Sequence, residues 1–221
     1  MYDAVIFDFD NTLVDYVWCD TNAIKHVWRG TDQDIDFEEF MDQSVESLYK
    51  IYEENDSDEN IHENRLQRTM KHFNIKWDNE YLDRYFAKYL KEYHLFDGVI
   101  DLLEKLHMTT KLSILTNAPD IMEQKRRIEI SGIGAYIKSI HIAGEIGHYK
   151  PEREAFLLAA DSLGVSPDTC LFVGDSEQYD IQGARNAGMR TAKRLTECSN
   201  KTSSADFVFS NFADLKRFIF D

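Results

Sequence analysis

Short apolar runs rich in β-branched residues alternate with amphipathic segments along most of this 221-residue chain. Runs of this kind are typical of buried strands, and the segments between them have helical spacing. The candidate strands are Ala4–Phe7, Leu112–Leu115, Ser139–Ile142, Leu171–Val173, Thr191–Lys193 and Phe207–Phe209. The alternation predicts an α/β fold with a doubly wound, Rossmann-like, mostly parallel sheet.

Three connecting segments carry helix signals. Val99–Leu106 has the apolar spacing of an amphipathic helix. Pro151 suits the first position of a helix that continues to Leu163, and Gly188 suits the residue just after a helix end.

The alternation is interrupted between residues 15 and 94. This stretch contains no strand-like run, and its aromatic and aliphatic residues recur with helical spacing. We therefore predict two domains, a core formed by residues 1–14 and 95–221 and an inserted, all-helical domain formed by residues 15–94. Aromatic stripes at this spacing are typical of core packing rather than of cofactor sites.

The charge balance excludes some classes of partner. The chain has 25 Lys and Arg against 40 Asp and Glu, a net charge of −15. A surface this acidic repels nucleic acids and anionic membranes, so we expect neither as a partner. It still permits a small anionic substrate, because a bound cation and one lysine can reverse the field inside a site.

Cysteine usage and the N-terminal sequence bear on the compartment. Cys19, Cys170 and Cys198 are widely separated and odd in number, which does not indicate a disulfide framework. The N-terminal residues lack a basic region and turn acidic early, unlike a signal peptide. We expect a cytoplasmic protein.

Polar residues follow several of the predicted strands. They are Asp8 and Asp10 after the first strand, Thr116 and Asn117 after the second, Lys150 in the loop after the third, and Asp175, Ser176 and Asp180 after the fourth. The carboxyl ends of parallel strands share one edge of the sheet, where ligands of open α/β folds bind. These side chains are therefore expected to converge.

The residue types suit phosphoryl transfer. That reaction needs a nucleophile, a divalent cation, donors to the phosphoryl oxygens and a proton donor for the leaving oxygen. Carboxylates are hard oxygen ligands that suit Mg²⁺, and a lysine supplies a fixed positive charge.

Four segments carry a family resemblance. DFDNTLVD from Asp8, ILTN ending at Asn117, KPEREAF from Lys150 and GDSEQYD ending at Asp180 occur in this order. Together they resemble the motifs of the haloacid dehalogenase superfamily, in its phosphatase branch with a helical cap after the first motif. The resemblance covers essentially the whole core, and the helical insert sits where that cap belongs.

The resemblance implies a role for each main residue. Asp8 would attack phosphorus and form a phosphoaspartate. Asp10 would protonate the leaving group and then activate water. Thr116 and Lys150 would bind phosphoryl oxygens, and Lys150 would also pair with Asp8. Mg²⁺ would be held by Asp8, the backbone carbonyl of Asp10, and Asp175.

Other motif residues are expected to act in support. Asp180 either orients metal-bound waters and Lys150 or lies just outside the metal's ligands. Ser176 and Thr12 are expected beside the site. Asn117 is a phosphate-binding candidate by its position and a turn-former by its residue type.

The function expected from this resemblance is Mg²⁺-dependent hydrolysis of a small phosphomonoester, such as a sugar phosphate or a nucleoside monophosphate. The cap is expected to close over the site and to select the substrate by contacts with its leaving group. Candidate specificity residues are Trp18, Trp28, Arg29, Arg65 and Arg68, and His148 is a candidate for a secondary contact. The sequence does not indicate an oligomeric state.

Several rival functions remain to be weighed. A 2-haloacid dehalogenase replaces the second aspartate of the first motif, so Asp10 argues against that activity. A phosphomutase would use the same core and stays open. A phospho-receiver domain has about half this length and no cap. A non-catalytic scaffold would not need every chemical position filled.

Overall fold

The chain forms two compact units. The computed structural model describes residues 2–54, 60–118, 120–196 and 202–221. One unit comprises Met1–Asp15 with Leu95–Asp221, and the other comprises Tyr16–His94. No helix within the described ranges is long and apolar enough to cross a membrane.

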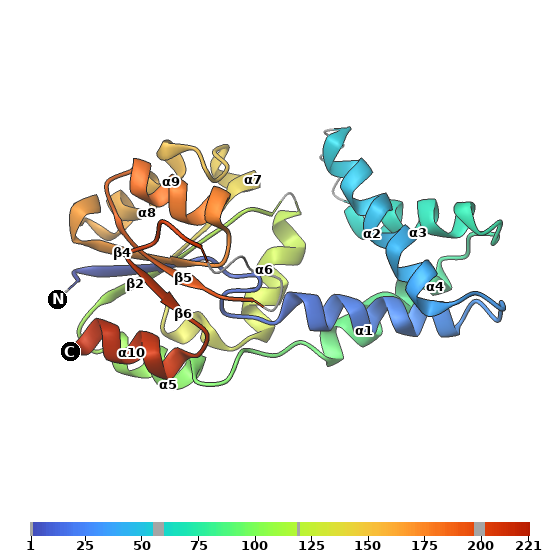
Figure 1. Cartoon of the computed structure of the whole chain (residues 1–221), viewed down its shortest axis with the longest axis horizontal. Helices are drawn as coiled ribbons and strands as arrows, with labels where there is room; N and C mark the ends of the chain where they lie inside the picture. Colours follow the sequence, from blue (N-terminus) through green and yellow to red (C-terminus); the bar gives the residue numbers. More distant parts are fainter. Residues whose placement is uncertain (1, 55–59, 119, 197–201) are drawn as a thin grey trace. The chain divides into compact units, whose positions relative to one another are not determined.

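The first unit contains a six-stranded sheet in the order β3-β2-β1-β4-β5-β6 (Figure 1). Every neighbouring pair is parallel. The strands are β1 Ala4–Phe7, β2 Lys111–Thr116, β3 Ser139–Ile142, β4 Cys170–Gly174, β5 Arg190–Arg194 and β6 Phe207–Phe209. All six match the predicted strands to within one residue at each end, and the doubly wound α/β fold is confirmed.

Helices cover both faces of the sheet. On one face α8 (Arg153–Leu163) and α9 (Gln182–Asn186) pack Phe156 and Ala184 against Ile6 and Phe172. On the other side α5 (Val99–Leu106) and α10 (Phe212–Phe220) lie together (Figure 1). The remaining helical segments of this unit are α6 Ile121–Ile130, α7 Ala143–Ile146, and the short 3-10 or π-helical segments Ile133–Ala135, Pro167–Thr169 and Glu177–Ile181.

Two of the helix predictions are confirmed and one is wrong. Helix α5 spans the predicted residues, and Gly188 follows the end of α9 with a φ of 90°. Pro151 is not the first residue of α8, which begins at Arg153. Residues 150 and 151 instead form a turn in which the Glu152 amide donates to the Tyr149 carbonyl (2.7 Å).

In its described residues the second unit contains helices and no strands, as expected of the insert. It consists of α1 Tyr16–Arg29, α2 Phe37–Glu53, α3 Ile61–His72 and α4 Glu80–Lys91. Helix α1 packs on α4 and α2 packs on α3. The core of this unit contains many of the aromatic residues that the periodicity placed on one face, including Phe40, Tyr85 and Tyr89.

We expect Gly183→Ala to destabilise the sheet-bearing unit. A Cβ atom at this position would lie 2.5 Å from Cε2 of Phe156 and 3.0 Å from Cα of Pro151. Overpacking of this kind typically costs about 1–3 kcal/mol. Thermal unfolding should show a lower midpoint for this variant. Gly134→Ala is the matched control, because no atom lies within 4 Å of its added Cβ; equal midpoints for both variants would contradict this packing.

Candidate active site

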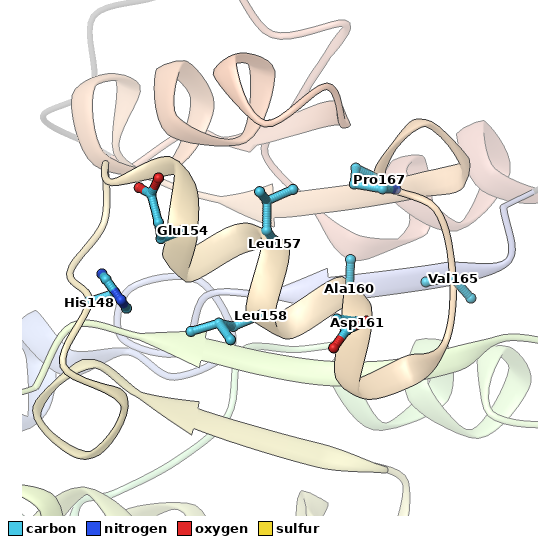
Figure 2. A pocket seen from close by; sticks show the side chains of 8 residues that line it. All are labelled: His148, Glu154, Leu157, Leu158, Ala160, Asp161, Val165 and Pro167. Atoms are coloured by element: carbon cyan, nitrogen blue, oxygen red, sulfur yellow. The ribbon is translucent and has the colours of Figure 1, made fainter.

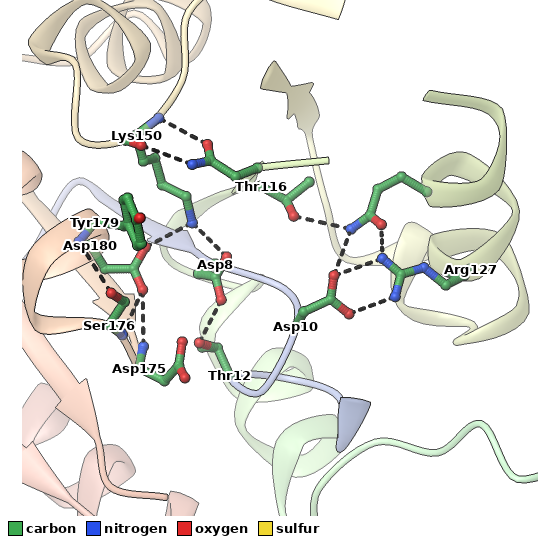
Figure 3. Close-up of polar contacts among 12 residues, drawn as sticks. Asp8, Asp10, Thr12, Thr116, Arg127, Lys150, Asp175, Ser176, Tyr179 and Asp180 are labelled. Atoms are coloured by element: carbon green, nitrogen blue, oxygen red, sulfur yellow. Dashed lines mark hydrogen bonds and ion pairs between the residues drawn. The ribbon is translucent and has the colours of Figure 1, made fainter. Parts of the chain in front are cut away.

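Strand β1 places the site at the centre of the sheet. It lies between β2 and β4, where the order of the strands reverses and the loops after neighbouring strands diverge. The Asp8 amide, just past the end of β1, donates to the Val173 carbonyl of β4 (2.8 Å). The loops that follow β1, β2, β3 and β4 thus bring their polar residues together (Figure 3).

Lys150 is the central cation of this cluster. Its Nζ donates to Oδ1 of Asp8 (2.6 Å) and to Oδ1 of Asp180 (2.7 Å). The side chains of Lys150, Asp8 and Asp180 are only 3%, 8% and 1% exposed. A charge this deeply buried requires a partner of opposite sign, so these contacts fix one another.

Asn117 fixes the backbone of the lysine. Its Nδ2 donates to the Lys150 carbonyl, and its Oδ1 accepts from the Lys150 amide, both at 2.8 Å. Asn117 immediately follows β2, so this pair of hydrogen bonds connects the loop after β3 to the end of β2. Through it, the sheet determines where the ammonium group lies.

Three carboxylates crowd around one point. One oxygen from each of Asp8, Asp175 and Asp180 lies within 4.8 Å of the others. Burial raises the pKa of Asp8 to about 7, with Lys150 opposing the rise and Asp180 adding to it. Burial and the charges of Asp8 and Asp180 raise the pKa of Asp175 to about 8. One lysine therefore does not compensate the negative charge of the cluster.

The hydrogen bonds divide these carboxylates into two kinds. Asp180 uses Oδ1 for Lys150, and its Oδ2 accepts from the backbone amides of Asp175 (3.1 Å) and Ser176 (2.9 Å). Asp175 makes no ion pair with a side chain in the described part of the chain. Crowded, ionisable oxygens of this type could hold a hard divalent cation, and all three aspartates offer one oxygen to the same place.

Gly174 explains why the fourth motif places glycine before Asp175. A Cβ atom at Gly174 would lie 2.5 Å from Oδ2 of Asp180. A side chain there would push Asp180 away from the two amides and from Lys150.

Two hydroxyl residues support the cluster. Thr12 is fully buried, and its Oγ1 donates to Oδ2 of Asp8 (2.8 Å). Both carboxylate oxygens of Asp8 are thus held, one by Thr12 and one by Lys150. Ser176 accepts the Tyr179 amide at Oγ (3.2 Å) and stabilises the turn that carries Asp180.

Asp10 and Thr116 contact a helix that the motif analysis did not include. Helix α6 begins after Asp120, whose side chain caps it by accepting the Glu123 amide (2.9 Å). Its buried residues include Gln124, which donates to Thr116, and Arg127, which donates to Asp10. Figure 3 shows the contact between Arg127 and Asp10. The available signal was the spacing of these two residues, one turn apart and just after a strand end.

Other candidates lie elsewhere. His148 pairs with Glu152 (2.9 Å) and lines a surface pocket of about 480 Å³ along α8 (Figure 2). The residues around this pocket include Leu157 and Leu158 but none of the clustered aspartates. His148 therefore does not belong to the cluster around Lys150.

The candidates in the helical unit differ in exposure. Arg65 is buried and binds Asp20 (2.7 Å), so it helps form the interior of this unit. Trp28 donates its Nε1 to the Ile35 carbonyl (2.8 Å), and Arg68 pairs with Glu54 (2.6 Å). Only Trp18 and Arg29 among these five candidates are exposed.

Comparisons with known proteins find phosphatases among the relatives of this chain. The N-acylneuraminate-9-phosphatase of Mus musculus is 29% identical over 198 residues, covering 85% of this chain and 79% of that protein. The glyceraldehyde 3-phosphate phosphatase of Methanopyrus kandleri is 31% identical over 208 residues, covering 87% of this chain and 84% of that protein.

A solved structure and a family model extend the comparison to the whole fold. The HAD-hydrolase YfnB of Bacillus subtilis, solved bound to magnesium, superimposes with a TM-score of 0.80 at 21% identity, covering 100% of this chain and 99% of that chain. The model of the haloacid dehalogenase-like hydrolases matches residues 2–188. The chain belongs to the haloacid dehalogenase-like hydrolase family.

Proposed function

We propose that this hydrolase is a Mg²⁺-dependent phosphomonoesterase with Asp8 as its nucleophile. The observation that carries the proposal is the buried contact between Lys150 and Asp8, with a second aspartate, Asp10, two residues further on. An oriented carboxylate and a nearby acid–base residue are the two groups that a covalent phosphatase needs. The named phosphatases among the relatives support the same class.

In the first step, a carboxylate oxygen of Asp8 attacks phosphorus. The bond from phosphorus to the leaving oxygen breaks, and Asp10 gives that oxygen its proton. Thr116 and Lys150 donate to the phosphoryl oxygens, on which negative charge concentrates. The products of this step are the free alcohol, a phosphoaspartate at residue 8 and the carboxylate of Asp10.

In the second step, water attacks the phosphorus of the phosphoaspartate. Asp10 takes the proton of the water, the bond between phosphorus and the Asp8 oxygen breaks, and inorganic phosphate leaves. Both aspartates return to their starting states. Thr12 holds one oxygen of Asp8 throughout, which keeps the other oxygen facing the lysine side of the site.

Asp8, Asp175 and the Asp10 carbonyl would hold the magnesium ion. When bound, Mg²⁺ supplies positive charge that favours ionised Asp8 and offsets charge on the phosphoryl oxygens. Burial first and the neighbouring carboxylates second raise the pKa values of Asp8 and Asp175, and this supports the assignment because a bound cation would favour their ionised forms. Asp180 would act from outside the ligands by orienting Lys150, and Asn117 would act through the Lys150 backbone.

The proposed substrate is a small phosphomonoester, such as a sugar phosphate or a nucleoside monophosphate. Two named relatives act on phosphorylated sugars or sugar acids, and a third, from Streptococcus pneumoniae, is a pyrimidine 5'-nucleotidase. Asp10 favours this class over a 2-haloacid dehalogenase, since halide leaves without a proton. A phosphomutase would need a second phosphate site, which distinguishes it experimentally.

A substrate panel separates these three activities. We expect phosphate release from para-nitrophenyl phosphate and from at least one phosphorylated metabolite, and no chloride release from 2-chloropropionate. Phosphate should be the product without any phosphorylated isomer, measured by colorimetric assay and by ³¹P NMR. Chloride release, or isomerisation in place of hydrolysis, would replace the phosphatase with the corresponding rival.

Asp8→Asn should lower para-nitrophenyl phosphate hydrolysis by about 10³-fold or more, because an amide cannot form the phosphoaspartate. Asp161→Asn is the matched control: this aspartate is exposed on α8 and should leave the rate unchanged. Steady-state rates with saturating Mg²⁺ measure the difference. Activity that survives in Asp8→Asn, or that persists in EDTA, would rule out this mechanism.

Asp175→Asn should separate metal binding from folding. The pKa values of Asp8 (about 7) and Asp175 (about 8) are raised in the folded state, so their contribution to stability is present at low pH and lost as pH rises towards 8. In EDTA, the wild-type melting temperature should therefore fall between pH 5 and pH 8, and Asp175→Asn should fall less. Added Mg²⁺ should stabilise the wild type and not the variant.

The opposite pattern would count against the metal site. If Mg²⁺ raised the melting temperature of Asp175→Asn as much as that of the wild type, the ion would bind elsewhere. Asp161→Asn should keep the wild-type response to both pH and Mg²⁺, which controls for the loss of one negative charge.

A further inference from the structure

Arg127 forms a bidentate ion pair with the carboxyl group of Asp10. Its Nη1 donates to Oδ1 (2.8 Å) and its Nη2 donates to Oδ2 (2.7 Å), as Figure 3 shows. Arg127 is only 5% exposed. A bidentate contact of this kind fixes the plane of a carboxylate as well as its position.

Gln124 links the same aspartate to Thr116. Its Nε2 donates to Oγ1 of Thr116 (3.0 Å) and approaches Oδ2 of Asp10 (3.3 Å), while its Oε1 accepts from Arg127. A hydroxyl group has one hydrogen and two lone pairs. Because Thr116 accepts from Gln124, its own hydrogen remains available for another acceptor, such as a phosphoryl oxygen.

The contacts also distinguish the two oxygens of Asp10. Oδ2 receives hydrogen bonds from both Arg127 and Gln124, whereas Oδ1 receives one from Arg127. Each carboxylate oxygen offers about two lone pairs. Oδ1 therefore keeps one lone pair open, and this is the position at which a proton can be carried to the leaving group and received from water.

A purely structural role would not predict this choice of partners. Burying an arginine to anchor α6 would require only some acceptor, such as a backbone carbonyl or the carboxylate of Glu123, whose Oε1 lies 3.8 Å from Nε of Arg127. The two polar side chains of α6 instead bind the proposed acid–base group and the proposed phosphate donor. In the described part of the chain, the side-chain partners of Asp10 are Gln124 and Arg127.

We propose that Arg127 and Gln124 are positioning residues that align Asp10 for proton transfer and Thr116 for phosphate binding. The inference rests on the phosphatase function proposed above. In this proposal neither residue contacts the substrate; each acts through the group it holds. The alignment matters most when the leaving oxygen is basic and needs a proton as its bond to phosphorus breaks.

The test compares leaving groups of different acidity. The substrates are aryl phosphates, from 2,4-dinitrophenyl phosphate, whose phenolate leaves without a proton, to phenyl phosphate, whose phenolate is basic. The measured quantity is kcat/KM, which includes only the steps up to release of the first product. It therefore isolates the step in which Asp10 is an acid from the step in which Asp10 is a base.

Arg127→Met should lower kcat/KM for phenyl phosphate by about 10²-fold and that for 2,4-dinitrophenyl phosphate by less than about 5-fold, because general acid catalysis contributes on this scale only where a proton is needed. Gln124→Leu should show a smaller loss with the same trend. Arg127→Lys keeps the positive charge but not the bidentate contact, and it should lose less kcat/KM for phenyl phosphate than Arg127→Met. Asp10→Asn sets the upper limit of the effect.

Arg126→Met is the matched control, since Arg126 is the neighbouring, exposed arginine of the same helix. It should leave both rates unchanged. An equal loss on both substrates in Arg127→Met and Gln124→Leu, or no loss on either, would overturn the proposal while leaving the phosphatase intact. If Arg127→Met does not fold, Gln124→Leu and Arg127→Lys decide by the same criterion. A wild type inactive on every aryl phosphate would instead contradict the phosphatase function itself.

Discussion

The ammonium group of Lys150 is the contact on which the rest of the site depends. It lies between two nearly buried carboxylates, Asp8 and Asp180, and its own charge is equally buried. Removing one member of such a group leaves an uncompensated charge in a medium that solvates it poorly. The positions of these three side chains are therefore held by the free-energy cost of separating buried charges. If Asp8 rotated away, Lys150 would lose one of its two partners.

The sheet supplies the rigidity that this arrangement requires. Asn117 binds the Lys150 backbone from the end of β2, and the Asp8 amide binds the Val173 carbonyl of β4. Parallel strands at the centre of a sheet are covered on both faces, so their ends move little relative to one another. A reactive oxygen placed on such ends keeps its orientation, which lowers the entropic barrier of the reaction.

The sequence allowed the strands and the motif residues to be predicted because both depend on local patterns. Buried apolar runs identify strands such as Ala4–Phe7, and the end of each parallel strand marks the functional edge. The roles of Gln124 and Arg127 could not be predicted, because they depend on how α6 packs against Asp10. Asp10 and Arg127 are more than 100 residues apart in the sequence. The prediction that Pro151 begins a helix was wrong for a similar reason, because the turn that presents Lys150 includes Pro151 and the helix begins after it.

The balance of charge in the site connects these observations. Four carboxylates lie in the site, those of Asp8, Asp10, Asp175 and Asp180. In the described part of the chain, their ion pairs are with Lys150 and Arg127. With all four carboxylates ionised, their negative charge would exceed that of these two cations by two, which is the charge of one divalent ion. Because Arg127 is committed to Asp10, it offers a phosphate group little compensation. A phosphate dianion thus meets Lys150, which is itself paired with Asp8 and Asp180, beside three carboxylates in a chain of net charge −15. In the proposed mechanism, the magnesium ion would therefore bind before the substrate or together with it.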